Sequence, residues 1–104
     1  MIEVTDATFG NEVLGAAGPV LVDFWAPWCK PCAAIEPHLE ALAADTGAKL
    51  VRVDVDAQLG VPPRYGVLSL PTVILFAGGE PRATVHGLRS REQYERAFAE
   101  WLSR

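Results

Sequence analysis

The sequence predicts an α/β fold with a mixed central β-sheet and helices on both faces. The run Val20–Trp25 is apolar except at Asp23, which suits a central strand that is covered by helices on both sides. A helical pattern follows, and then a second strand-like run at Leu50–Asp54, so that the three segments predict a parallel βαβ unit. Two later strand-like runs are joined by glycines and predict an antiparallel hairpin.

The elements that precede the central strand are short. Ile2–Val4 is a strand candidate. Thr5 or Asp6 can cap a first helix, because short polar side chains satisfy the free N–H groups of a first turn. Phe9 and Val13 lie four residues apart and predict the inner face of that helix.

The helix that follows the central strand is expected from about Cys32 to Ala44. Ile35, Leu39 and Leu42 fall at i, i+4 and i+7 and mark its buried face. Pro31 lies at its start, where the missing N–H costs nothing.

The C-terminal half supplies the hairpin and a last helix. Prolines 62 and 63 keep any helix within residues 57–66 short. Thr72–Phe76 is a predicted strand, Gly78 and Gly79 form the turn, and residues 82–87 form the antiparallel return. Ser90 and Gln93 predict a capping box for the last helix, whose apolar face is formed by Tyr94, Phe98, Trp101 and Leu102. The predicted order is β-α-β-α-β-α-β-β-α.

Composition and charge exclude several functions. The 104 residues suffice for a single domain, residues 1–104, and monomer is the default state. The net charge of −4 and the absence of a Lys/Arg stripe argue against nucleic acid and anionic membranes as partners. No apolar run reaches membrane-spanning length, and the first residues do not look like a secretory signal, so we expect a cytoplasmic protein.

The two cysteines, Cys29 and Cys32, carry the most specific signal. They lie three residues apart, between a predicted strand and a predicted helix, which is a recognised redox pattern. The amides of a first helical turn favour a thiolate on the first sulfur. The alternatives are a static disulfide, which would stabilise little across so short a loop, and a zinc site. Zinc would need further ligands, and the spacing of His38 and His86 matches no zinc-finger pattern, so we expect no metal.

Over essentially its whole length the chain resembles the thioredoxin family. The matching segments, in order and at the family's spacing, are Val22–Ala26, Trp28–Cys32, Val53–Asp56, Tyr65–Gly66, Leu70–Thr72, Phe76, Gly79 and Gly87. The resemblance implies the thioredoxin fold and a protein disulfide reductase that needs no cofactor. It also implies disulfide-containing client proteins as substrates and an NADPH-dependent thioredoxin reductase as the partner that resets the pair.

The resemblance also implies a catalytic role for three residues. Cys29 is the nucleophile, exposed at the start of a helix, and Cys32 resolves the mixed disulfide. Asp23 takes the proton of Cys32 through water. Burial in the apolar strand would raise the pKa of Asp23 toward the range where it can accept a proton. The alternative is a structural ion pair with Arg52, where the family commonly has Lys; an arginine cannot give up its proton near neutral pH.

The resemblance further implies a client-binding rim around the cysteines. It includes Trp28, Leu70, Pro71 and Gly87, with Lys30 and Pro31 of the cysteine motif. Pro71 would follow a cis peptide bond, the backbone of Leu70 would pair with an extended client strand, and Gly87 would let another backbone approach closely.

Several of these residues have simpler interpretations. Pro71 could be an ordinary proline at the start of a strand, and Trp28 a core residue. Lys30 could favour the Cys29 thiolate and make the pair more oxidising, or it could be a solvated side chain. His86 could border the groove and make docking depend on pH, or lie on the surface, as we expect for His38. Trp25 and Trp101 are expected in the core.

Two other functions remain open from the sequence. One is an oxidant or isomerase outside the cytoplasm, which would run the same chemistry in the opposite direction. The other is a non-catalytic module that uses the groove only for docking.

Overall fold

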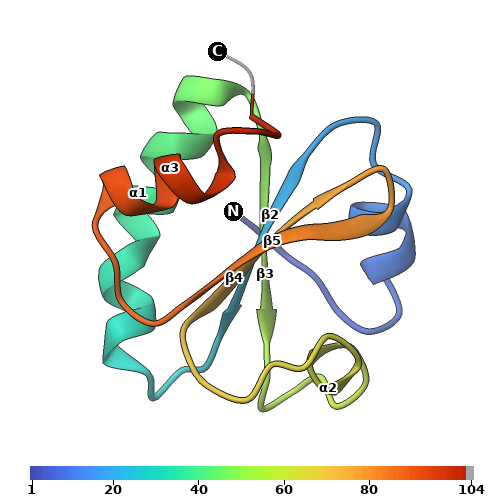
Figure 1. The fold of residues 1–104 in the computed structure, drawn as a ribbon. Helices are drawn as coiled ribbons and strands as arrows, with labels where there is room; N and C mark the ends of the chain where they lie inside the picture. The colour runs from blue at the N-terminus through green and yellow to red at the C-terminus, as the bar shows by residue number, and fades with distance from the viewer. Residues whose placement is uncertain (103–104) are drawn as a thin grey trace.

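A five-stranded sheet lies between two pairs of helical segments (Figure 1). The computed structural model describes residues 1–102, so the last two residues of the predicted domain lie outside the described residues. In chain order the elements are β1 (Ile2–Glu3), the π-helix η1 (Gly10–Leu14), β2 (Val20–Trp25), α1 (Lys30–Thr46), β3 (Lys49–Asp54), α2 (Val61–Arg64), β4 (Thr72–Ala77), β5 (Glu80–His86) and α3 (Arg91–Phe98). This is the predicted order of elements.

The strands lie in the order β1-β3-β2-β4-β5. The neighbours β3 and β2 run parallel, as expected for the βαβ unit, and β3 also pairs in parallel with β1. The hairpin strand β4 pairs antiparallel with both β2 and β5. The predicted central strand is therefore in the middle of the sheet, and five of its six residues are buried.

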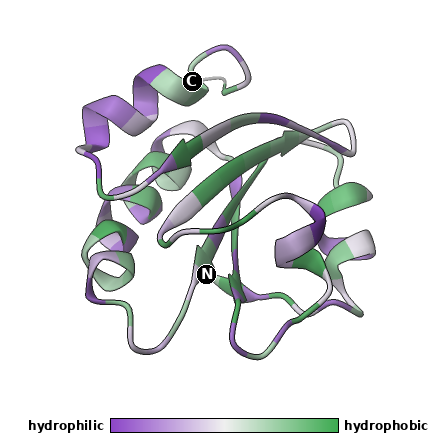
Figure 2. Cartoon of the chain, turned by 60° about the horizontal axis from the view of Figure 1, so that its bottom comes forward, coloured by the Kyte–Doolittle hydropathy of each residue, from purple (hydrophilic) through white to green (hydrophobic). Residues whose placement is uncertain are grey.

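Successive side chains of β2 point to opposite faces of the sheet and divide the core into two clusters. On the first face, Val20, Val22 and Phe24 pack with apolar residues of η1 and α2. On the second face, Leu21 packs with apolar residues of α1 and α3. Figure 2 shows the central strands mainly in hydrophobic colours and most of α3 in hydrophilic ones.

The N-terminal helix differs from the prediction. Only a short π-helix, Gly10–Leu14, forms, although Phe9 and Val13 are buried as expected. The hydroxyl of Thr5 accepts a hydrogen bond from the N–H of Thr8 at 3.2 Å, so Thr5 caps the turn that leads into this helix. Asp6 instead accepts from the N–H groups of Gly60 and Val61, at the start of α2. Its carboxylate therefore stabilises a different helix from the predicted one.

Other boundaries and burial assignments also change. Helix α1 begins at Lys30 and ends at Thr46, beyond the predicted limits on both sides, because Cys29 caps its first turn and Gly47 ends it in a left-handed conformation. Trp25 and Trp101 are half-buried and not, as predicted, in the core. Trp101 follows the end of α3 and packs against the second cluster from outside.

The capping box of α3 is confirmed. The Ser90 hydroxyl accepts from the N–H of Gln93 at 3.2 Å, and the Gln93 side chain accepts from the N–H of Ser90 at 2.9 Å. These bonds satisfy two backbone donors at the start of the helix. Among the helices of residues 1–102, none has the length and apolar character that a membrane crossing requires.

Candidate active site

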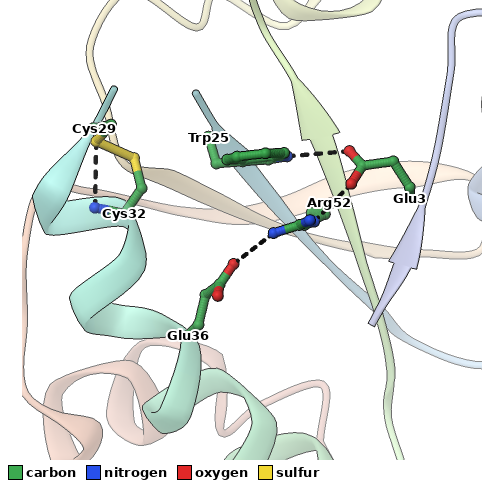
Figure 3. Close-up of polar contacts among 6 residues, drawn as sticks. All are labelled: Glu3, Trp25, Cys29, Cys32, Glu36 and Arg52. Atoms are coloured by element: carbon green, nitrogen blue, oxygen red, sulfur yellow. Dashed lines mark hydrogen bonds and ion pairs between the residues drawn. A yellow bond between two sulfur atoms is a disulfide. The ribbon is translucent and has the colours of Figure 1, made fainter. Parts of the chain in front are cut away.

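The two cysteines lie at the start of α1 and form a disulfide, with their Cα atoms 5.3 Å apart (Figure 3). Cys29 is the N-cap residue of the helix, and Pro31 lies in its first turn, as predicted. The Cys32 N–H donates to the Cys29 sulfur at 3.2 Å. An N–H that points at this sulfur stabilises negative charge on it, so Cys29 is the cysteine that the fold favours as a thiolate.

The two sulfurs differ in their access to solvent. In this disulfide state Cys29 retains 6% of its exposure and Cys32 only 1%. Cys29 is thus less exposed than the resemblance implied, but it is the more accessible of the pair. Both pack in a small apolar cluster with Ala26, next to Trp25 and Leu70. Apolar surroundings of this kind keep water away from the reacting sulfurs.

Asp23 is fully buried on β2, on the face of the sheet that α1 covers. Along this face of the strand it lies between Leu21, which packs against α1 and α3, and Trp25, which packs against the cysteine cluster. Burial raises the pKa of Asp23 from its ordinary value of 3.8 to about 7, and the Glu36 carboxylate adds to the rise. Arg52 opposes this rise, while Glu3 contributes to it. A carboxyl with a pKa near 7 can accept or release a proton at neutral pH.

Within the described residues the alternative ion pair between Asp23 and Arg52 does not form. Arg52 lies opposite Asp23 in the register of β3 and β2, yet neither Asp23 oxygen has a hydrogen-bond partner among residues 1–102. Arg52 donates instead to Glu3 at 2.7 Å and to Glu36 at 2.9 Å (Figure 3). The guanidinium therefore influences Asp23 only through its charge.

The predicted rim residues Leu70, Pro71 and Gly87 come together where β4 begins and β5 ends. The Leu70–Pro71 peptide bond is cis, as the resemblance implied. The N–H of Gly87 donates to the Pro71 carbonyl at 2.8 Å. Gly87 has a φ of +84°, a conformation that favours glycine. Leu70 contacts the cysteine cluster, so this corner lies directly beside the disulfide.

An apolar cleft of about 360 Å³ lies beside this corner. It is lined by Trp28, Val55, Val67, Leu68, Ser69 and Leu70. Trp28 is 68% exposed, and its indole N–H donates to Asp56 at 2.8 Å, so the ring is held at the surface and not in the core. Lys30 and Pro31 are also exposed, on the first turn of α1.

Sequence reasoning missed two parts of this site. Val67 and Leu68 line the cleft, and Leu68 is 94% exposed, an unusual exposure for a large apolar side chain that no sequence pattern marks. Glu3 on β1 and Glu36 on α1 both accept hydrogen bonds from Arg52 on β3, and these contacts join residues far apart in the sequence. The spacing of Glu36, four residues after Cys32, places it one turn further along the same helix face, and this was the one available signal.

The site offers no arrangement for a metal ion in the part of the chain that the structure describes. No group of three His, Cys, Asp or Glu side chains gathers within residues 1–102 in a way that could hold a metal. His86 is exposed, and its Nδ1 lies 3.1 Å from the hydroxyl of Thr72. The site combines two sulfurs, a nearby buried carboxyl and an apolar rim, which together suit exchange of a disulfide.

Comparison with known proteins agrees with this geometry. The family model described as Thioredoxin matches residues 1–100. A thioredoxin of Pseudomonas aeruginosa is 45% identical over 95 residues, which cover 89% of this chain and 88% of that protein. A thioredoxin of Mycolicibacterium smegmatis is 41% identical over 105 residues, which cover 97% of this chain and 94% of that protein. A bifunctional thioredoxin reductase/thioredoxin of Mycobacterium leprae is 44% identical over 92 residues, covering 86% of this chain and 20% of that protein.

Proposed function

We propose a set of residue roles for this chain, which belongs to the thioredoxin family. The chain is a thiol–disulfide oxidoreductase that acts as a protein disulfide reductase through Cys29 and Cys32. The observation that carries the roles is the asymmetry of the pair. Cys29 caps the helix, accepts an N–H bond at its sulfur and is the more accessible cysteine, whereas Cys32 is almost fully buried.

Cys29 is the nucleophile of the first step. Its thiolate attacks one sulfur of a client disulfide, forms a Cys29–client disulfide and releases the other client sulfur as a thiolate. In the second step the Cys32 thiolate attacks the Cys29 sulfur and closes the intramolecular disulfide, and the second client thiolate leaves. Two electrons pass from the cysteine pair to the client, and two protons complete its thiols.

Asp23 accepts the proton that Cys32 must lose before it attacks. The carboxyl is buried on the face of β2 that lies against α1, and its pKa is raised by burial to about 7. It is therefore a base of suitable strength near neutral pH. A water molecule between the two groups is the proposed path for the proton.

The apolar rim binds the client. Trp28 and Leu70 line the cleft beside the disulfide, and Pro71 and Gly87 form the corner next to it. The backbone of Leu70 offers hydrogen bonds to an extended client segment, and Lys30 and Pro31 contact it from the first turn of α1. Disulfide-containing proteins of diverse sequence are the substrate class that such a rim suits, because backbone pairing and apolar contact are sequence-tolerant.

The partner that resets the disulfide is proposed to be an NADPH-dependent thioredoxin reductase. Support comes from the Mycobacterium leprae relative, whose name joins a thioredoxin reductase and a thioredoxin in one protein. We place this chemistry in the cytoplasm, where the chain would act as a monomeric reductant of protein disulfides. Bacterial relatives with the name thioredoxin support this proposal.

Two serine variants test the roles of the cysteines. With a peptide that contains a single disulfide as client, Cys29→Ser should lose all measurable reduction, because the remaining thiol, Cys32, is almost fully buried and cannot reach the client. Cys32→Ser should instead accumulate a covalent Cys29–peptide adduct that mass spectrometry detects. If Cys29→Ser keeps full activity in the cell, the biological role is docking and not redox exchange. If Cys32→Ser forms no adduct, Cys29 is not the attacking residue.

The reduction potential of the pair tests the proposed direction. The reference values are about −270 mV for thioredoxin itself and about −120 mV for a dedicated oxidant, so the two alternatives are well separated. We expect equilibration in defined thiol buffers to give a value near the first. A value above about −200 mV, where isomerases are poised, would overturn the cytoplasmic reductant and give Lys30 a larger role.

A further inference from the structure

The guanidinium of Arg52 lies at the centre of a group of four side chains (Figure 3). Its Nε donates to one oxygen of Glu3 at 2.7 Å, and its Nη1 donates to Glu36 at 2.9 Å. Its carbon lies 4.0 Å from the ring centroid of Trp25, a cation–π distance. The indole N–H of Trp25 donates to the second oxygen of Glu3 at 3.1 Å. The guanidinium is therefore held on three sides, and we call Glu3, Arg52 and Glu36 the arginine clamp.

The arginine clamp lies next to a carboxyl that it does not bind. Asp23 is directly opposite Arg52 in the β2–β3 register, so both side chains start on the same face of the sheet. A buried carboxylate normally pairs with the nearest cation, because an unpaired buried charge is costly. Both Asp23 oxygens nevertheless have no partner within residues 1–102. The hydrogen bonds that Arg52 donates to carboxylates go to the two clamp glutamates and not to Asp23.

The position of Glu36 connects the clamp to the redox pair. It lies on α1 four residues after Cys32, so the same helix that carries the cysteines also holds the arginine. Its side chain is about a quarter exposed, and the Arg52 side chain about a third, so the ion pair is only partly screened by water. One arginine faces two glutamates here, which leaves a net negative charge of one beside Asp23.

We propose that Glu36 is a positioning residue that, together with Glu3, holds the Arg52 guanidinium away from Asp23, so that this carboxyl remains unpaired and can take up a proton. The consequence for Cys32 rests on the role given to Asp23 under Proposed function. An arginine suits this arrangement because its planar fork donates in two directions at once, whereas a lysine ammonium has no such fork.

Within residues 1–102, the charged and titratable groups that face Asp23 come from four elements. They are Glu36 on α1, Arg52 on β3, Glu3 on β1 and Tyr94 on α3. Burial raises the pKa of Tyr94, which therefore stays neutral, and its hydroxyl donates to the Gly87 carbonyl and not to Asp23. Of these three charged groups, Arg52 lowers the pKa of Asp23, and both glutamates raise it. Loss of the charge of either glutamate therefore lowers the pKa of Asp23.

Glu36→Gln is the variant that tests this proposal. It keeps the size of the side chain and an acceptor oxygen for Arg52 but removes the charge. The primary measurement is the titration of the Asp23 carboxyl carbon by NMR in the oxidised protein, where neither cysteine titrates. We expect the midpoint to move to lower pH by about 0.5 to 1 unit, because a like charge is lost and Arg52 is less compensated. Glu36→Asp keeps the charge and should restore most of the original midpoint.

Glu40→Gln is the matched control. Glu40 lies one turn further along α1 and is exposed, so the same change of charge there should move the midpoint by less than about 0.2 unit. If the midpoint in Glu36→Gln equals that of the wild type, the proposal is overturned. It is also overturned if the two variants shift the midpoint equally, because the effect would then be one of net charge.

A second measurement separates this inference from the role of Asp23 in catalysis. The reduced protein is mixed with the single-disulfide peptide, and the pH dependence of closure of the Cys29–Cys32 disulfide is followed in one turnover. If the NMR midpoint and the rate profile shift together in Glu36→Gln, the clamp and the proton transfer to Asp23 are both supported. If only the NMR midpoint shifts, the clamp is supported and the proposed catalytic role of Asp23 is contradicted.

Discussion

Thr72 and Asp23 are both fully buried polar side chains, and they lie on opposite faces of the same sheet. Thr72 is on the first face, opposite Phe24 in the register, and its hydroxyl donates to the Ser69 carbonyl at 2.7 Å. Asp23 is on the second face, one residue away on the neighbouring strand, and neither of its oxygens is bonded within residues 1–102. One face satisfies its buried polar group, and the other leaves a titratable group unsatisfied.

The apolar surroundings of the two residues also differ. The first face includes three aromatic rings in mutual contact, Phe9, Tyr65 and Phe76, with centroids 5.0 to 5.6 Å apart. The second face is formed by the helix that carries the cysteines and by α3. The three rings of the first face therefore contribute stability through packing. On the second face, the unpaired carboxyl of Asp23 is destabilising when it is charged, and it is the group proposed to accept the proton of Cys32.

Phe76→Ala should have the largest effect on stability. Phe76 is fully buried, and its ring meets Phe9 and Tyr65 edge-on. Loss of the ring removes buried apolar area and leaves a cavity, which costs about 3 to 5 kcal/mol of unfolding free energy. Urea unfolding at pH 8 measures this loss. The NMR titration of Asp23 in the same variant should be unchanged, and a shift would show that the two faces are not separable.

Asp23→Ala should change stability in the opposite direction, by an amount that grows as the pH rises from about 4 to about 7 and is largest above that. Because the pKa of Asp23 is about 7 in the folded protein and near 3.8 when the chain is unfolded, the folded state binds this proton more tightly. The contribution of Asp23 to stability is therefore fully present below about pH 4, is lost as the pH rises to about 7, and stays lost above it. At about 1.36 kcal/mol per unit, the full cost is about 4 kcal/mol.

Unfolding of Asp23→Ala at two pH values measures that cost. We expect a gain of about 2 to 4 kcal/mol at pH 8, reduced by the small cavity that the change leaves, and no gain at pH 4. Glu40→Ala, which removes an exposed carboxylate, is the control and should show no such difference between the two pH values. Equal stability of Asp23→Ala and wild type at pH 8 would mean that the carboxyl is not destabilising when charged.

The sequence predicted those features that depend on neighbouring residues. Strand β2 follows from its apolar run, and the cap of α3 from Ser90 and Gln93, because each is decided within a few residues. The cysteine pair was likewise visible from its spacing and its position between strand and helix. Burial of Asp23 followed from the apolar strand around it, although the state of its oxygens did not.

The features that could not be predicted depend on residues far apart in the chain. Asp6 caps α2 and not the first helix, because the amides of Gly60 and Val61 lie within 2.9 Å of its carboxylate across 54 residues or more of sequence. Arg52 faces Asp23 in the sheet but bonds to Glu3 and Glu36, which reach it from another strand and from the cysteine helix. A prediction that considers one pair at a time would join Asp23 to Arg52. Three carboxylates compete for this one guanidinium, and the outcome can be known only once the fold has brought them together.

Thr72→Val gives the smallest effect and the sharpest contrast with Asp23. Because the Thr72 hydroxyl donates to Ser69, the Nδ1–H of His86 donates to the Thr72 oxygen at 3.1 Å, and the hydroxyl is satisfied on both sides. Valine has nearly the same shape but leaves both partners unbonded, so we expect a loss of about 1 to 2 kcal/mol in urea unfolding. The loss should appear at both pH 5 and pH 8, since neither Ser69 nor Thr72 changes charge and His86 keeps its Nδ1–H when protonated. A gain at pH 8, as in Asp23→Ala, would contradict the distinction between a satisfied and an unsatisfied buried group on the two faces.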